Sequence, residues 1–126
     1  MMAGQTALVI DDDAQIRRLM LRILAHAGYR AIEAPNGRLG VALFRTERPA
    51  VVVTDILMPE QEGIETIRTM RQEAPTTRIV AVSGGGQDRN MLFLGMAMEL
   101  GADAVLAKPF HPDELLAAVK GGSVPG

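Results

Sequence analysis

The sequence predicts an α/β fold with a doubly wound parallel sheet, in which helices cover both faces of the sheet. Three observations lead to this prediction. Five short apolar runs recur along the chain, segments of helical period separate them, and the runs lack the polar alternation of solvent-facing strands. The 126 residues fit one domain, and 48% of them are apolar, so a core can form without disulfides, which the absence of Cys rules out.

The five apolar runs are the expected strands. The run from Val51 to Val53 is β-branched throughout, which favours a strand that is buried on both faces. In chain order the expected strands are Thr6–Ile10, Tyr29–Ala34, Val51–Thr54, Ile79–Val82 and Ala104–Ala107.

The segments between the runs are the expected helices. The first is the best defined, because apolar residues from Ile16 to Ala27 follow helical spacing and Gly28 stands where a helix would stop. The others are expected over Gly37–Thr46 after Asn36, Gly63–Glu73 before Pro75, Asp88–Leu100 before Gly101, and Pro112–Lys120 before two glycines. This alternation implies right-handed crossovers and places a ligand site beyond the carboxyl ends of the strands.

Composition and charge exclude several classes of function. The formal net charge is −2 with acids and bases interspersed, and three Phe and one Tyr offer few rings for base stacking, which argues against nucleic-acid binding. The first 13 residues have no basic start and only a short apolar run, so they predict neither a signal peptide nor a membrane span. We expect a cytoplasmic protein with no direct nucleic-acid or membrane partner.

Acidic residues follow two of the expected strands. Asp11, Asp12 and Asp13 come directly after the first strand, and Asp55 comes directly after the third, at the same edge of the sheet. Crowded carboxylates raise one another's pKa or bind a cation, and hard oxygen ligands favour Mg²⁺ or Mn²⁺. Acids at this place also commonly cap a helix. Asp13, the nearest to the helix, is the expected cap, and the other two are expected to turn toward Asp55.

A hydroxyl and an ammonium group join these acids. Ser83 follows the fourth strand and Lys108 follows the fifth. Such a set suits a phosphoryl group, with the carboxylate as nucleophile, cations to neutralise the oxygens and a hydroxyl donor. Taken singly, Ser83 also fits a turn residue and Lys108 a solvated lysine. No Gly-Lys-Ser/Thr follows the glycines 84–86, which disfavours a P-loop.

Four short motifs stand in order along the chain. They are Leu8-Val9-Ile10-Asp11-Asp12, Val53-Thr54-Asp55-Ile56-Leu57-Met58-Pro59 with Gly63 beyond, Ala81-Val82-Ser83-Gly84, and Gly101-Ala102-Asp103 before Lys108-Pro109-Phe110. In these motifs the sequence resembles the response-regulator receiver family from Ala7 to about Lys120. The resemblance implies a flavodoxin-like (βα)5 fold with strand order 2-1-3-4-5. From length and composition we expect one domain over 1–126, with a core at about 6–120 and a flexible tail at 121–126.

The resemblance also implies a role for each polar residue at the sheet edge. Asp55 would be the phosphoacceptor, and Ser83 and Lys108 would contact the phosphoryl group. Mg²⁺, or Mn²⁺, would be held by the carboxylates of Asp11, Asp12 and Asp55 and by the backbone carbonyl of Leu57. The family often has a cis Lys-Pro bond, here Lys108–Pro109, which would aim the lysine inward.

The partners that the resemblance implies are proteins. The phosphoryl donor would be a sensor histidine kinase or a histidine phosphotransfer protein of a bacterial two-component system. The chain would signal to a downstream protein target and would catalyse only its own phosphorylation and dephosphorylation, so it would not be an enzyme. Two alternatives stay open: a phosphorylation-independent binding module, and an aspartyl-phosphate phosphatase of the haloacid dehalogenase type, which needs an acid where this chain has Leu57.

Two further features bear on signalling. Val105 stands three residues before the lysine, where the family usually has Tyr or Phe, so an aromatic rotamer switch is not available there. The fourth helix is too apolar for one buried stripe, which suits a homodimer or partner face as well as core packing. Its apolar residues are Met91, Leu92, Phe93, Leu94, Met96, Met98 and Leu100. We assign no ligand role to His26 or His111; His26 suits the dipole at a helix end.

Overall fold

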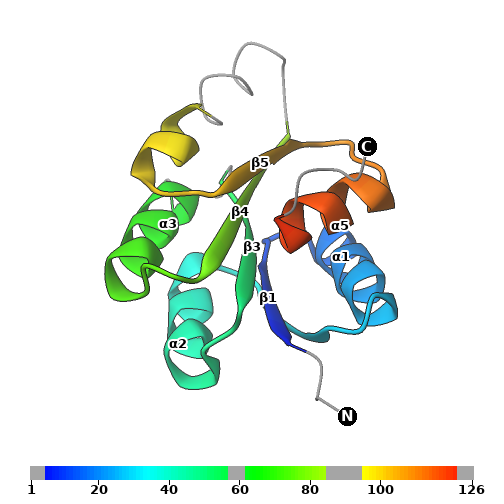
Figure 1. Cartoon of the computed structure of the whole chain (residues 1–126), viewed down its shortest axis with the longest axis horizontal. Helices are drawn as coiled ribbons and strands as arrows, with labels where there is room; N and C mark the ends of the chain where they lie inside the picture. The colour runs from blue at the N-terminus through cyan, green and yellow to red at the C-terminus, as the bar shows by residue number, and fades with distance from the viewer. Residues whose placement is uncertain (1–4, 57–61, 85–94, 122–126) are drawn as a thin grey trace.

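The computed structural model describes residues 5–56, 62–84 and 95–121 of the chain (Figure 1). Strands and helices alternate as predicted. In chain order they are β1 Thr6–Ile10, α1 Ala14–His26, β2 Arg30–Ala34, α2 Gly37–Glu47, β3 Val51–Asp55, α3 Glu62–Glu73, β4 Arg78–Ser83, β5 Ala104–Ala107 and α5 Pro112–Lys120. Residues 95–100 are also helical and belong to the predicted fourth helix, whose first half lies outside the described residues.

The five strands form one parallel sheet in the order β2-β1-β3-β4-β5, which confirms the predicted topology. Ile10 at the end of β1 lies opposite Thr54 of β3, and Asp55 at the end of β3 lies opposite Val82 of β4. The carboxyl ends of neighbouring strands therefore meet at one edge of the sheet, as expected for this kind of fold.

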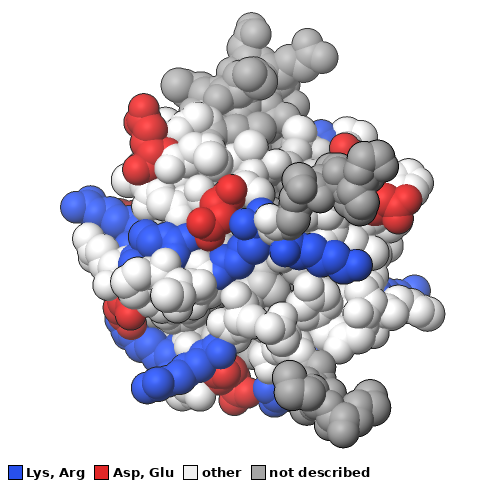
Figure 2. All heavy atoms as spheres, in the orientation of Figure 1, with Lys and Arg blue, Asp and Glu red and all other residues white. Residues whose placement is uncertain are grey.

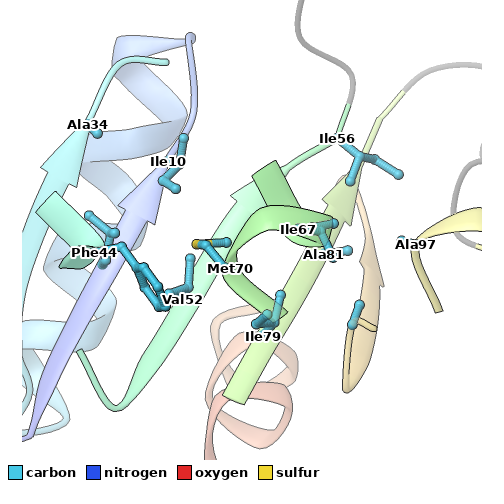
Figure 3. Close-up of a cluster of buried hydrophobic side chains, with 12 residues drawn as sticks. Ile10, Ala34, Phe44, Val52, Ile56, Ile67, Met70, Ile79, Ala81 and Ala97 are labelled. Atoms are coloured by element: carbon cyan, nitrogen blue, oxygen red, sulfur yellow. The ribbon is translucent and has the colours of Figure 1, made fainter. Parts of the chain in front are cut away.

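Helices lie on both faces of the sheet, so the core has two halves. Alternate residues of β1 face opposite sides: Leu8 and Ile10 belong to the half that includes Phe44 of α2 and Ile67 and Met70 of α3 (Figure 3). The intervening residues of β1 belong to the other half, which packs against α1 and α5. Every residue of β3 is buried, as its β-branched run predicts. Each fully buried Leu or Ile side chain stabilises the fold by roughly 1.5–3 kcal/mol.

Side chains at the loops cap the helices that follow. Asp13 caps α1, because its carboxylate accepts hydrogen bonds from the backbone N–H groups of Gln15 and Ile16 at 2.9 and 3.2 Å. This confirms the role predicted for Asp13. His111 caps α5 in a reciprocal capping box with Glu114. His111 therefore has a structural role that the sequence did not predict.

Charged side chains of both signs occur on the face shown in Figure 2, in keeping with the mixed composition. Among the described residues, no helix has the length and apolar character that crossing a membrane requires. The cytoplasmic location stays a prediction.

Candidate functional site

Three acids meet where β1 and β3 end. Asp11, Asp12 and Asp55 each offer a carboxylate oxygen, and these oxygens lie within 4.8 Å of one another. Asp11 and Asp55 are buried, whereas Asp12 is exposed. The acids come together because β1 and β3 are adjacent parallel strands, which is the arrangement that the sequence predicted.

The ammonium group of Lys108 contacts two of these acids. Its Nζ lies 3.1 Å from Asp11 Oδ2 and 3.3 Å from Asp55 Oδ2. The Lys108–Pro109 bond is cis, as the resemblance implied. Burial alone would lower the pKa of Lys108, but the negative charges of Asp55 and Asp11 outweigh burial and raise the pKa above its ordinary value. The lysine is therefore charged at neutral pH.

Ser83 is the last residue of β4 and is fully buried. Its hydroxyl donates a hydrogen bond to the Gly84 carbonyl oxygen at 3.4 Å, and its own carbonyl accepts one from the backbone N–H of Lys108 at 2.7 Å. Ser83 thus lies at the predicted edge, on the strand that pairs with β3. Its contact with a phosphoryl group stays a prediction. Leu57, the predicted carbonyl ligand, lies outside the described residues.

Two residues to which the sequence analysis gave no role support the acids. Gly63 in α3 packs so closely that a Cβ there would lie well under 3.0 Å from the backbone of Asp55 and Ile56. Arg17 of α1 donates a hydrogen bond to the backbone carbonyl of Asp11 at 2.7 Å. The available signals were a glycine near the start of a helix and an arginine beside an apolar stripe, and neither specifies a contact partner.

The charge balance of the cluster is negative, because three carboxylates accompany one ammonium group. Like charges held this close favour a bound cation, and carboxylate oxygens are ligands of hard divalent ions. The cluster can therefore hold a metal ion through Asp11, Asp12 and Asp55. A carboxylate such as Asp55 can in addition act as a nucleophile.

The fold and the acidic cluster agree with a match to known proteins. The model of the response regulator receiver domain matches residues 7–120. The chain belongs to this family. The match confirms the family that the four motifs resemble. Receiver domains are signalling domains.

Individual relatives cover nearly the whole chain. Chemotaxis protein CheY of Thermotoga maritima is 34% identical over 117 residues, which are 92% of this chain and 95% of that protein. The phosphate regulon transcriptional regulatory protein PhoB of Pseudomonas aeruginosa is 33% identical over 121 residues, which are 94% of this chain and 52% of that protein. The chain thus spans about half the length of several transcriptional regulators that it matches.

A solved structure shares the fold with TM-score 0.82. It is a response regulator protein from Burkholderia pseudomallei with a phosphorylated aspartic acid, calcium ion and citrate. The two proteins are 27% identical, and the likeness covers 92% of this chain and 66% of the other.

Proposed function

We propose that this receiver domain accepts a phosphoryl group on Asp55 from a phosphohistidine of a sensor histidine kinase or phosphotransfer protein in a bacterial two-component phosphorelay. The observation that carries the proposal is the setting of the Asp55 carboxylate. It is buried, 3.3 Å from the Lys108 ammonium group, and part of a cluster that can hold a cation. Positive charge near the carboxylate would neutralise the oxygens of an incoming phosphoryl group.

In the proposed transfer, a bond forms between a carboxylate oxygen of Asp55 and phosphorus. The nitrogen–phosphorus bond of the donor breaks, and its electron pair stays on the imidazole nitrogen. Lys108 neutralises one phosphoryl oxygen and the Ser83 hydroxyl donates to another. Later attack of water on phosphorus releases phosphate and regenerates the carboxylate. The domain then catalyses only these steps on itself and has no external substrate to turn over.

Mg²⁺, or Mn²⁺, is the proposed cofactor, and it would add positive charge at the phosphoryl oxygens when bound. Its ligands would be Asp11, Asp12, Asp55 and the backbone carbonyl of Leu57. The relative from Burkholderia pseudomallei carries a calcium ion together with a phosphorylated aspartic acid. Because calcium and magnesium both bind oxygen ligands, this supports a metal-assisted reaction in the present chain.

The proposed output is a protein–protein contact with a downstream target or with a second copy of the chain, formed at the fourth-helix face. In the described end of that helix, Met96 and Met98 are exposed at 38% and 48%, whereas Ala97 is buried. Exposed methionines suit adaptable docking. Because Val105 replaces the usual aromatic residue, a rearrangement on phosphorylation would have to start from Ser83.

Intact-mass measurement after incubation with Mg²⁺ and acetyl phosphate tests this function. We expect a phosphoryl adduct on the wild type that disappears when Mg²⁺ is chelated. Asp55→Asn keeps the size of the side chain but lacks the nucleophilic carboxylate, so it should gain no adduct. Circular dichroism of both proteins confirms that they are folded.

Other outcomes would favour the alternatives. A folded, metal-binding wild type that gains no adduct would support the phosphorylation-independent binding module. Multiple turnover of an added phosphomonoester, lost in Asp55→Asn, would support the phosphatase, although Leu57 stands where that class needs an acid.

A further inference from the structure

We propose that Arg17 is a positioning residue for the metal site, held in place by Glu33, and this inference rests on the function proposed above. Arg17 lies in α1 and its side chain is only 12% exposed. Its Nε donates to Glu33 Oε1 at 2.6 Å, and its Nη1 donates to the backbone carbonyl of Asp11 at 2.7 Å. One guanidinium group thus connects β2 to the acidic cluster.

The carbonyl that Arg17 contacts belongs to the peptide unit between Asp11 and Asp12. A peptide unit is planar, so fixing its oxygen fixes the direction in which the chain leaves Asp11 toward Asp12. That direction determines how the two carboxylates stand relative to each other. Arg17 therefore acts on the geometry of the cluster without offering a ligand atom itself.

The remaining polar groups of Asp11 have partners of their own. Its N–H donates to the Ala34 carbonyl at 3.2 Å, and its carboxylate accepts from the Asp13 N–H at 2.9 Å and from Lys108 at 3.1 Å. Without Arg17, the Asp11 carbonyl would lose this contact, while the N–H and the carboxylate of Asp11 would keep theirs. The Asp11–Asp12 peptide could then rotate while the Asp11 side chain stays in place.

Glu33 explains how an arginine is tolerated next to a cation site. A positive charge near the cluster would oppose metal binding, but the carboxylate of Glu33 compensates the charge of Arg17. The planar guanidinium group presents donors in a fixed geometry, so it can hold Glu33 and the Asp11 carbonyl at the same time. A lysine has one nitrogen and does not reproduce this arrangement.

Isothermal titration of each folded protein with Mg²⁺ alone tests the inference. We expect Arg17→Ala to weaken Mg²⁺ binding by about 10-fold, which is the lower end of the effect of groups that orient metal ligands. Arg18→Ala is the matched control, because Arg18 lies on the same helix, carries the same charge and is exposed. It should bind Mg²⁺ within about twofold of the wild type, because its loss changes only screened surface charge.

Glu33→Gln and Arg17→Lys extend the test should Arg17→Ala not fold. Both should weaken Mg²⁺ binding. Glu33→Gln weakens the ion pair that holds Arg17, and a lysine at position 17 cannot contact Glu33 and the Asp11 carbonyl in the same way. If the folded Arg17 variants bind Mg²⁺ as tightly as Arg18→Ala, even with lower melting temperatures, Arg17 is a structural residue only and the inference is wrong. A wild type that binds no Mg²⁺ would instead overturn the proposed metal site itself.

Discussion

The two ends of the parallel sheet both gather charged side chains, but they hold them differently. At the carboxyl end, the carboxylates of Asp11 and Asp55 are buried and share the ammonium group of Lys108. At the amino end, a hollow of about 920 Å³ is lined in part by Arg45, Arg48, Glu73, Arg78 and Lys120. Arg45 pairs there with Glu73, and 57% and 36% of these two side chains are exposed.

The difference lies in what surrounds the charges. Water and salt screen the exposed Arg45–Glu73 pair, so forming or losing it changes the free energy of unfolding very little. The carboxyl end has less water to screen its acids, so their mutual repulsion and their desolvation cost stability. The buried acids at the carboxyl end therefore lower the stability of the fold, but they can bind a ligand strongly. The exposed charges at the amino end cost little stability, and water and salt weaken their effect on a ligand.

The largest loss of stability is expected from a substitution that disturbs the packing beneath the carboxyl end of the sheet. Gly63→Ala would press a Cβ against the backbone of Asp55 and Ile56, which cannot move aside as a side chain can. We expect the free energy of unfolding, measured with urea, to fall by about 3 kcal/mol.

Gly121→Ala is the matched change at the amino end. Its Cβ would meet the guanidinium end of Arg78, which can move aside with the loss of its hydrogen bond to the Ala118 carbonyl, and the φ of +72° at Gly121 would cost about 1 kcal/mol. Equal losses for the two variants would contradict the view that the carboxyl end is the more tightly constrained.

An intermediate effect is expected from Lys108→Met, which removes the ammonium group and keeps an apolar side chain. The buried carboxylates of Asp11 and Asp55 then lose their shared partner. Breaking a fully buried pair costs about 3–5 kcal/mol, but the lysine side chain is 20% exposed. Water therefore reduces the expected loss to roughly 1–2 kcal/mol in urea unfolding without metal.

Mg²⁺ provides the control for this variant, because a bound cation replaces the missing charge and stabilises the folded state. Repeating the urea titration with Mg²⁺ should recover most of the loss. A variant as stable as the wild type without metal would mean that the acids do not depend on Lys108.

The smallest effect is expected at the amino end. The hydrogen bond from Arg45, together with its positive charge, lowers the pKa of Glu73 below the ordinary value of 4.5. A lowered pKa contributes stability at pH values above about 4.5, and this contribution is lost as the pH falls through the folded-state value. Because the pair is exposed, Glu73→Gln should leave the melting temperature at pH 7 within replicate scatter. A clear drop would show that screening at this end is weaker than we infer.

Much of the fold and site was predictable from sequence because both follow from chain order. Apolar runs and helical spacing are local, and they located the elements whose two ends are described to within one or two residues, although Asp55 and Ser83 proved to be the last residues of their strands. Asp11, Asp12 and Asp55 could be grouped from the sequence alone, because the carboxyl ends of neighbouring parallel strands must meet.

The remaining features depend on contacts that no local pattern encodes. Arg17 and Glu33 are 16 positions apart, and their pairing depends on side-chain rotamers on a helix and a neighbouring strand. The need for Gly63 depends on how closely α3 approaches β3. The cap formed by His111 was missed because histidine is not among the usual N-cap residues.

The contact between Lys108 and Asp11 joins positions that are 97 residues apart in the chain. During synthesis, Asp55, the proposed phosphoacceptor, leaves the ribosome long before Lys108 does. The contact of Lys108 with the acids can form only after β5 has been made and has paired with β4. A nascent chain therefore carries Asp55 before it carries the lysine that we propose to neutralise the oxygens of an incoming phosphoryl group. On this proposal, the chain becomes competent for phosphorylation only once β5 is in place.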